Sequence, residues 1–200
     1  TTGNGIIDTN GNTLTLTGSI GGGGITKSGA GTLILTGANT MSGLNVGPNG
    51  GTVAVTQAAA LGAGPIALTG FSAATNAANP TLRFDSAMTV ANNFTNTLTS
   101  SFDTNGNDVV VTGSISGGGI DKVGAGTLTL ANATNSLPNQ AWVYGGTLDV
   151  AGTLTGTVQV QSGGALAGTG TINGNVFIRD GGILAPGASA GTLTINGPLN

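Results

Sequence analysis

The acidic residues are the first candidates for chemistry in this chain, and all seven are aspartates: Asp8, Asp85, Asp103, Asp108, Asp121, Asp149 and Asp180. General acid–base catalysis on polysaccharides needs two or three carboxylates held close together with shifted pKa values. Asp8 and Asp103 instead occupy identical Asp-Thr-Asn-Gly-Asn stretches, where an aspartate accepts the backbone hydrogen bonds of a turn. Since the chain contains no glutamate and no histidine, we expect no catalytic residues. A polysaccharide-acting enzyme is the least favoured function.

The stretch from Asp8 to Asn12 has the spacing that opens a calcium loop. An EF-hand loop then needs glycine at its sixth position and a terminal glutamate, but Thr13 stands at that position. In the second copy, Asp103 and Asp108 flank the turn and are a pair that can share a cation. We expect a structural turn rather than a metal site.

Two glycine runs, 21–24 and 117–119, resemble phosphate-binding loops only in composition. A phosphate loop needs a helix start after the glycines and a Gly-Lys-Ser/Thr ending, whereas an Ile-x-Lys sequence and a strand follow here. No cofactor is therefore expected. Lys27 and Lys122 stand at equivalent places after these runs, and we expect them to be exposed turn residues that keep strand edges soluble.

Trp142 and Tyr144 are the only tryptophan and the only tyrosine of the chain, and they alternate with Ala141 and Val143. Alternation places both rings on one face of a strand. Exposed, the pair would be a contact surface for a sugar or a partner protein; buried, it would fill a wide cross-section. Burial is favoured, because large aromatic side chains usually pack.

The elements that must position these residues come from an internal repeat with an offset of 95 residues. Residues 7–55 return as residues 102–150, each copy being short strands separated by glycine turns. In Thr13-Leu14-Thr15-Leu16-Thr17 apolar residues alternate with threonine, which is typical of a half-buried strand. The structural repeat motif comprises Gly22, Gly24, Ile25, Lys27, Gly29, Gly31, Thr32, Leu33 and Leu35, with Gly117, Gly119, Ile120, Lys122, Gly124, Gly126, Thr127, Leu128 and Leu130 in the second copy.

The pattern Gly-Gly-Gly-Ile-x-Lys-x-Gly-Ala-Gly-Thr-Leu-x-Leu, with the preceding Asp-Thr-Asn-Gly-Asn turn, resembles the autotransporter-associated β-strand repeat of bacterial passenger domains. The end of the chain is also similar, from Gly168-Thr169-Gly170-Thr171 to Gly191-Thr192-Leu193-Thr194-Ile195. The resemblance implies a right-handed parallel β-helix exported by a type V route. It implies no catalytic residues, because the motif is structural.

The composition of the chain argues against several classes of function and structure. Charged residues make up 6% of the chain, against about 25% in ordinary domains, and the four cations are scattered, which argues against nucleic-acid binding. The chain has no cysteine, hence no disulfide framework. No apolar stretch of about 20 residues occurs, so we expect no membrane insertion of this segment.

We predict an all-β fold, a right-handed parallel β-helix that forms one solenoid domain over residues 1–200, as a fragment of a longer passenger. Turns of about 20–25 residues would give roughly eight to ten turns. Neighbouring turns would be stacked at the strand spacing of a sheet, about 4.8 Å. A loop is expected to project at Phe71–Pro80, and the alanine run Gln57–Leu61 allows one helical turn. The alternative fold is an antiparallel β-sandwich.

Three functions stay open besides the enzyme. The first is a structural stalk of a secreted or surface-displayed passenger that supports export-coupled folding and display. The second is an adhesin that contacts a host-surface ligand and contributes to virulence. The third is self-association through open strand edges. The resemblance implies the protein's own C-terminal translocator barrel, outside this chain, as a partner. A second copy of the protein and a host-surface ligand are the alternative partners of the open functions. The implied location is extracellular or on the surface of a Gram-negative bacterium.

Overall fold

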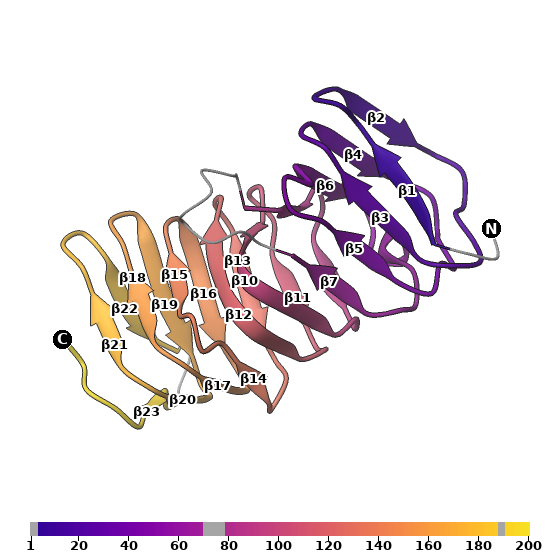
Figure 1. The fold of residues 1–200 in the computed structure, drawn as a ribbon. Helices are drawn as coiled ribbons and strands as arrows, with labels where there is room; N and C mark the ends of the chain where they lie inside the picture. Colours follow the sequence, from indigo (N-terminus) through magenta and orange to yellow (C-terminus); the bar gives the residue numbers. More distant parts are fainter. Residues whose placement is uncertain (1–3, 70–78, 188–190) are drawn as a thin grey trace.

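The computed structural model describes residues 4–69, 79–187 and 191–200 and forms a parallel β-solenoid of about nine turns (Figure 1). The chain winds steadily from the indigo end to the yellow end, so the two termini lie at opposite ends of the stack. Every described strand pair is parallel, which confirms the predicted β-helix and excludes the antiparallel sandwich. Right-handed coiling remains a prediction from the resemblance.

Each turn contributes strands to flat faces, here called walls 1, 2 and 3. Wall 1 contains β1 (Gly5–Asp8), β3 (Ile25–Ser28), β5 (Leu44–Val46), β7 (Ile66–Leu68), the first parts of β10 (Phe94–Asp103) and β12 (Ile115–Val123), β14 (Asn135–Ser136), β17 (Thr153–Thr155), β20 (Thr171–Asn173) and β23 (Thr194–Ile195). Wall 2 contains β2 (Thr13–Leu16), β4 (Thr32–Leu35), β6 (Thr52–Val55), β8 (Thr81–Phe84), the second parts of β10 and β12, β15 (Ala141–Val143), β18 (Val158–Val160) and β21 (Val176–Ile178).

Wall 3 is a six-stranded sheet of β9 (Met88–Val90), β11 (Val109–Val111), β13 (Thr127–Leu130), β16 (Gly146–Val150), β19 (Gly164–Gly168) and β22 (Ile183–Pro186). In the third turn a 3₁₀ turn, η1 (Ala58–Leu61), contacts β9 from the neighbouring turn. This confirms the helical turn expected from the alanine run. No helix within the described ranges is long and apolar enough to cross a membrane.

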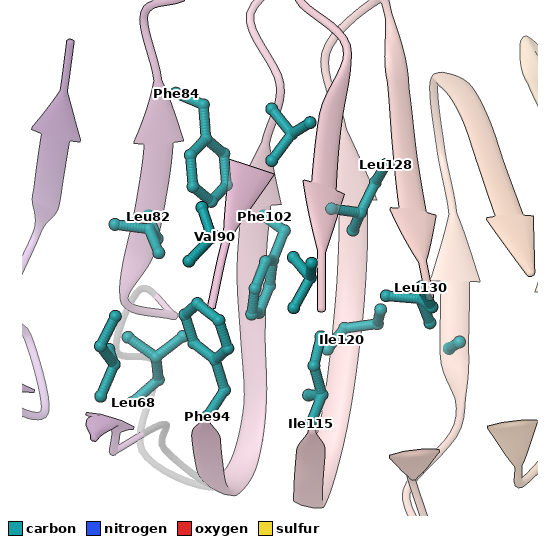
Figure 2. Packing of buried hydrophobic residues seen from close by; sticks show 14 of the residues in the cluster. Leu68, Leu82, Phe84, Val90, Phe94, Phe102, Ile115, Ile120, Leu128 and Leu130 are labelled. Atoms are coloured by element: carbon teal, nitrogen blue, oxygen red, sulfur yellow. The ribbon is translucent and has the colours of Figure 1, made fainter. Parts of the chain in front are cut away.

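The core consists of ladders of inward side chains, one from each turn. On wall 1 the ladder runs through Ile25, Leu44, Ile66, Phe94 and Ile115, all of them buried. Alternation explains the pattern, since every second residue of a strand faces the interior. Figure 2 shows the middle of the core, where side chains from facing walls meet. The rings of Phe94 and Phe102 pack edge to face there, with centroids 5.3 Å apart.

Turn length explains a property of the repeat that the sequence does not reveal. Most turns add about 20 residues, but the step from Ile66 to its partner Phe94 takes 28 (94 − 66). On wall 1, the residue four turns after Ile25 is Ile115. The repeat equivalent of Ile25, which is Ile120, lies on wall 2 of the same turn as Ile115. The 95-residue offset therefore equals four turns plus one wall. Most of the predicted loop at Phe71–Pro80 lies outside the described residues.

Candidate functional site: the repeated corner

The Asp-Thr-Asn-Gly-Asn stretch forms the same tight corner in both copies. Its first residue caps the turn, because the Asp8 carboxylate accepts a hydrogen bond from the Asn10 backbone N–H at 2.8 Å. The Asp103 carboxylate accepts one from the Asn105 N–H, also at 2.8 Å. Both asparagines have positive φ, which this residue type tolerates better than most. These contacts support the turn interpretation of both aspartates.

A Gly-Ala-Gly corner of the next turn stacks on each of these turns. The Thr9 hydroxyl donates to the Ala30 carbonyl at 2.6 Å, and Thr104 donates to Ala125 at the same distance. Glycine is required at the first position, because Gly124 has a φ of +73° and any Cβ there would overlap the Asp103 carboxylate. Gly29 has the same relation to Asp8 in the first copy. The two corners therefore stack this closely only because the residue at this position has no side chain.

The lysines fasten this corner from the inside, and the prediction that they are exposed is wrong. Lys27 and Lys122 are both completely buried. Lys27 Nζ donates to the carbonyls of Ser28, Gly29 and Gly50 at 2.6–2.8 Å. Two of these carbonyls belong to the lysine's own corner, and the third belongs to the next turn.

The second copy repeats the arrangement. Lys122 Nζ donates to the carbonyls of Val123, Gly124 and Gly145 at 2.8–3.0 Å. All three ammonium protons are thereby used, which is what allows a charged group to lie in the interior. Each lysine thus joins two consecutive turns at a corner.

Burial also changes the acidity of the lysines. Desolvation lowers the pKa of Lys122 from 10.5 to about 8, and the charge of Asp103 partly opposes that shift. Desolvation lowers the pKa of Lys27 as well, with Asp8 in the opposing role. The aspartate of the corner therefore contributes twice, by capping the turn and by helping to keep the lysine charged.

The other motif residues form the strands around the corner. The side chains of Ile25, Leu33, Leu35, Ile120, Leu128 and Leu130 are buried in the core. Thr32 and Thr127 begin β4 and β13 and are partly exposed. Gly22 and Gly117 have positive φ, and Gly31 and Gly126 pass too close to the preceding corner to carry a side chain. Gly24 and Gly119 lie where the chain enters the lysine-bearing strands.

The aspartates near the corners have structural hydrogen-bond partners. Within the described residues, no three histidine, cysteine or acidic side chains lie together. Asp108, which was considered as a cation partner for Asp103, accepts a hydrogen bond from the Thr127 N–H at 3.0 Å. Asp85 pairs with Arg83 at 2.7 Å, and this hydrogen bond lowers the pKa of Asp85. Asp108 thus links neighbouring turns of the solenoid, and Asp85 holds an ion pair.

The two aromatic residues lie on the outer side of wall 2. As predicted, they share one face, and their ring planes are parallel within 6° with centroids 5.9 Å apart. The prediction that they are buried is wrong, because Tyr144 is 47% exposed and Trp142 only half-buried. Aliphatic residues and phenylalanines fill the interior, so the strand alternation directs Trp142 outward.

The sequence does carry a signal for the buried lysines. Lys27 follows Ile25 by two positions, and Lys122 follows Ile120 by two, so period-2 alternation places each lysine on the core face. The general tendency of lysine to be exposed conflicts with that pattern. The three backbone carbonyls that accept from each ammonium group explain why the lysines are buried.

The family comparison agrees with this geometry. Residues 25–55, which contain Lys27, its corner and the partner corner of the next turn, match the family model described as Passenger-associated-transport-repeat. This repeat marks autotransporter passenger domains. Repeat and solenoid together support an autotransporter passenger β-helix, and such passengers are secreted or surface-displayed. No match was found among curated proteins or among solved structures.

Proposed function

We propose that this segment is a structural stalk of its passenger, which folds turn by turn during export and holds other parts of the protein away from the cell. The observation that carries the proposal is the buried lysine, which joins one turn to the next. The same neighbour-to-neighbour pattern recurs at Asn39, whose side chain donates to the Ala60 carbonyl at 2.6 Å. A turn emerging from a pore needs only its predecessor as a template.

The proposal places the segment outside a Gram-negative cell, delivered by a translocator barrel of the same protein. The chain is consistent with passage through a narrow pore, because it has no cysteine and so forms no cross-linked loop. A stalk needs no catalytic residue. Its length is set by the number of turns, at about 4.8 Å for each.

The test compares two internal deletions in the full autotransporter. Leu148 pairs with Leu166, so removing residues 148–165 joins Thr147 to Leu166 and deletes one turn of 18 residues in register. Removing residues 148–156 deletes half a turn and places wall 3 residues next to wall 2 residues. Surface display is measured with an N-terminal epitope tag, and folding by the protease-resistant core.

We expect the one-turn deletion to be displayed at close to the wild-type level, and the half-turn deletion to lose most of its display and its resistant core. Equal display of the two proteins would show that register does not matter and would overturn the folding mechanism. Loss of attachment to cells in the displayed one-turn deletion would argue against a pure spacer.

A second candidate function is adhesion, either to a host surface or to another copy of the protein. The observation that favours it is the exposure of Tyr144, which stacks on Trp142 on the outer side of wall 2. Replacing both residues by alanine should then abolish attachment and leave export unchanged. Attachment that survives the replacement would remove this surface from consideration.

A further inference from the structure

The outer side of wall 2 in the sixth to ninth turns collects the chain's recognition chemistry. Two parallel columns of side chains face outward there, one running through Asp121, Trp142, Gln159 and Phe177. The second column runs through Tyr144, Gln161 and Arg179, each one position beyond a ladder-paired core residue. We call these seven residues the aromatic–amide face. It holds the only tryptophan, the only tyrosine, one of two arginines and two of four glutamines.

The middle of this face is fixed in place by its own contacts. Gln159 lies between Trp142 and Phe177 and is only 7% exposed. Its carbonyl oxygen accepts from the Arg179 guanidinium at 2.8 Å, and its amide donates to the Gln140 side chain. The Arg179 guanidinium also lies over the Phe177 ring, 5.1 Å from the centroid.

The backbone supports this arrangement at Gln140. That residue has a φ of +86°, a conformation that costs a non-glycine residue free energy and persists where its surroundings hold it. The Gln140 side chain accepts a hydrogen bond from the Gln159 amide of the next turn. The face is therefore organised before any ligand arrives, which lowers the entropy cost of binding.

Several polar groups of the face have unused hydrogen-bonding capacity. Among the described residues, the Trp142 indole N–H and the Tyr144 hydroxyl make no hydrogen bond, and the Gln161 side-chain amide nitrogen is buried without a partner. From the described part of the chain, Asp121 receives one long hydrogen bond, from Asn79 at 3.4 Å. Burial raises the pKa of Asp121, and burial followed by the Asp121 charge raises the pKa of Tyr144, which places the two groups within electrostatic reach.

We propose that the aromatic–amide face is a binding site for a neutral saccharide chain. Exposed aromatic rings supply flat apolar contact to the C–H side of a sugar ring, while amide, carboxylate and guanidinium groups hydrogen-bond its hydroxyls. The charges of Asp121 and Arg179 balance, so the face does not favour an anion. Its columns repeat at the strand spacing of about 4.8 Å, which suits a polymer lying along the solenoid axis.

This proposal is independent of the stalk function and gives a ligand class to the second candidate function. Because Trp142 is the only tryptophan, the intrinsic fluorescence of the protein reports on this face alone. The experiment titrates the purified protein with neutral hexose oligosaccharides of the cello-, malto- and galacto- series and follows tryptophan emission at low and high salt. Heparin serves as an anionic comparison.

We expect a saturable, salt-insensitive change in emission with at least one neutral oligosaccharide. Tyr144→Ala and Gln161→Ala should each weaken binding at least about tenfold. The matched control is Gln57→Ala, since Gln57 is an exposed glutamine of the third turn, and it should leave binding unchanged. Circular dichroism spectra show whether each variant keeps its fold.

Three outcomes would overturn the proposal. The first is that no oligosaccharide of the panel gives a saturable change. The second is that folded Tyr144→Ala and Gln161→Ala proteins bind as the wild type does. The third is that heparin alone binds and is released by salt, which would make the face an electrostatic site for anions. None of these outcomes affects the deletion test of the stalk.

Discussion

Replacing the buried lysine of the second copy by methionine gives the most informative stability measurement. Lys122→Met keeps the length and apolar body of the side chain but removes its three donors. The carbonyls of Gly124 and Gly145 accept no other hydrogen bond within the described chain, whereas that of Val123 also accepts from Thr104. Two partly buried acceptors are thus left unpaired, which lowers the free energy of unfolding by about 1–3 kcal/mol each.

The buried charge offsets part of this loss, because removing the ammonium also removes its desolvation penalty. We therefore expect Lys122→Met to lower the free energy of unfolding by about 2–4 kcal/mol. Urea unfolding is followed by far-ultraviolet circular dichroism and by the fluorescence of Trp142, whose strand pairs with that of Lys122. Lys27→Met should act in the same direction.

The matched control is Arg83→Met, which removes a partly exposed cation from its ion pair with Asp85. Such pairs contribute up to about 1 kcal/mol, so the control should be nearly neutral. If Lys122→Met costs under about 0.5 kcal/mol and matches the control, the lysine does not fasten the corner and the reasoning fails.

Three further predictions concern the same corner and the core. The pKa of Lys122 falls from 10.5 to about 8 on folding, so the unfolded chain binds more protons between these pH values and stability rises from pH 8 to 10.5. Urea midpoints should show a smaller rise in Lys122→Met. Gly124→Ala should cost at least about 2 kcal/mol more than Gly106→Ala, because both glycines have positive φ but only the first would bring Cβ onto Asp103; equal midpoints would contradict this. Phe102→Ala should cost about 3–5 kcal/mol in urea unfolding, since its buried ring packs against two other phenylalanines. A loss below 1 kcal/mol would mean that the core collapses around the gap.

The sequence was sufficient to predict the architecture, because the fold depends on local rules. Alternation such as that of Thr32-Leu33-Ile34-Leu35 places one face inward, and glycines at fixed places allow turns to stack closely. The corner at Asp8 was also predictable, since an aspartate before Asn-Gly caps a turn by hydrogen bonds within a few residues.

The sequence was not sufficient where the outcome depends on contacts between turns. The carbonyls that hold Lys27 come partly from Gly50, 23 positions away, and nothing local identifies them as partners. The two repeat copies lie on different walls because four turns take 90 residues (115 − 25) rather than 95, which a fixed offset does not show. The exposure of Tyr144 depends on how completely other residues fill the interior.

The central claim is that neighbouring turns stabilise one another at their corners, and that a buried lysine holds two of these corners together. Hydrogen exchange of the native protein, measured by mass spectrometry with and without Lys122→Met, tests this most directly. We predict that protection falls at residues 104–107, 122–126 and 143–147, and that the strands around Leu33 and Ile172 keep theirs. A uniform loss along the chain, or unchanged exchange at these three corners, would contradict the account.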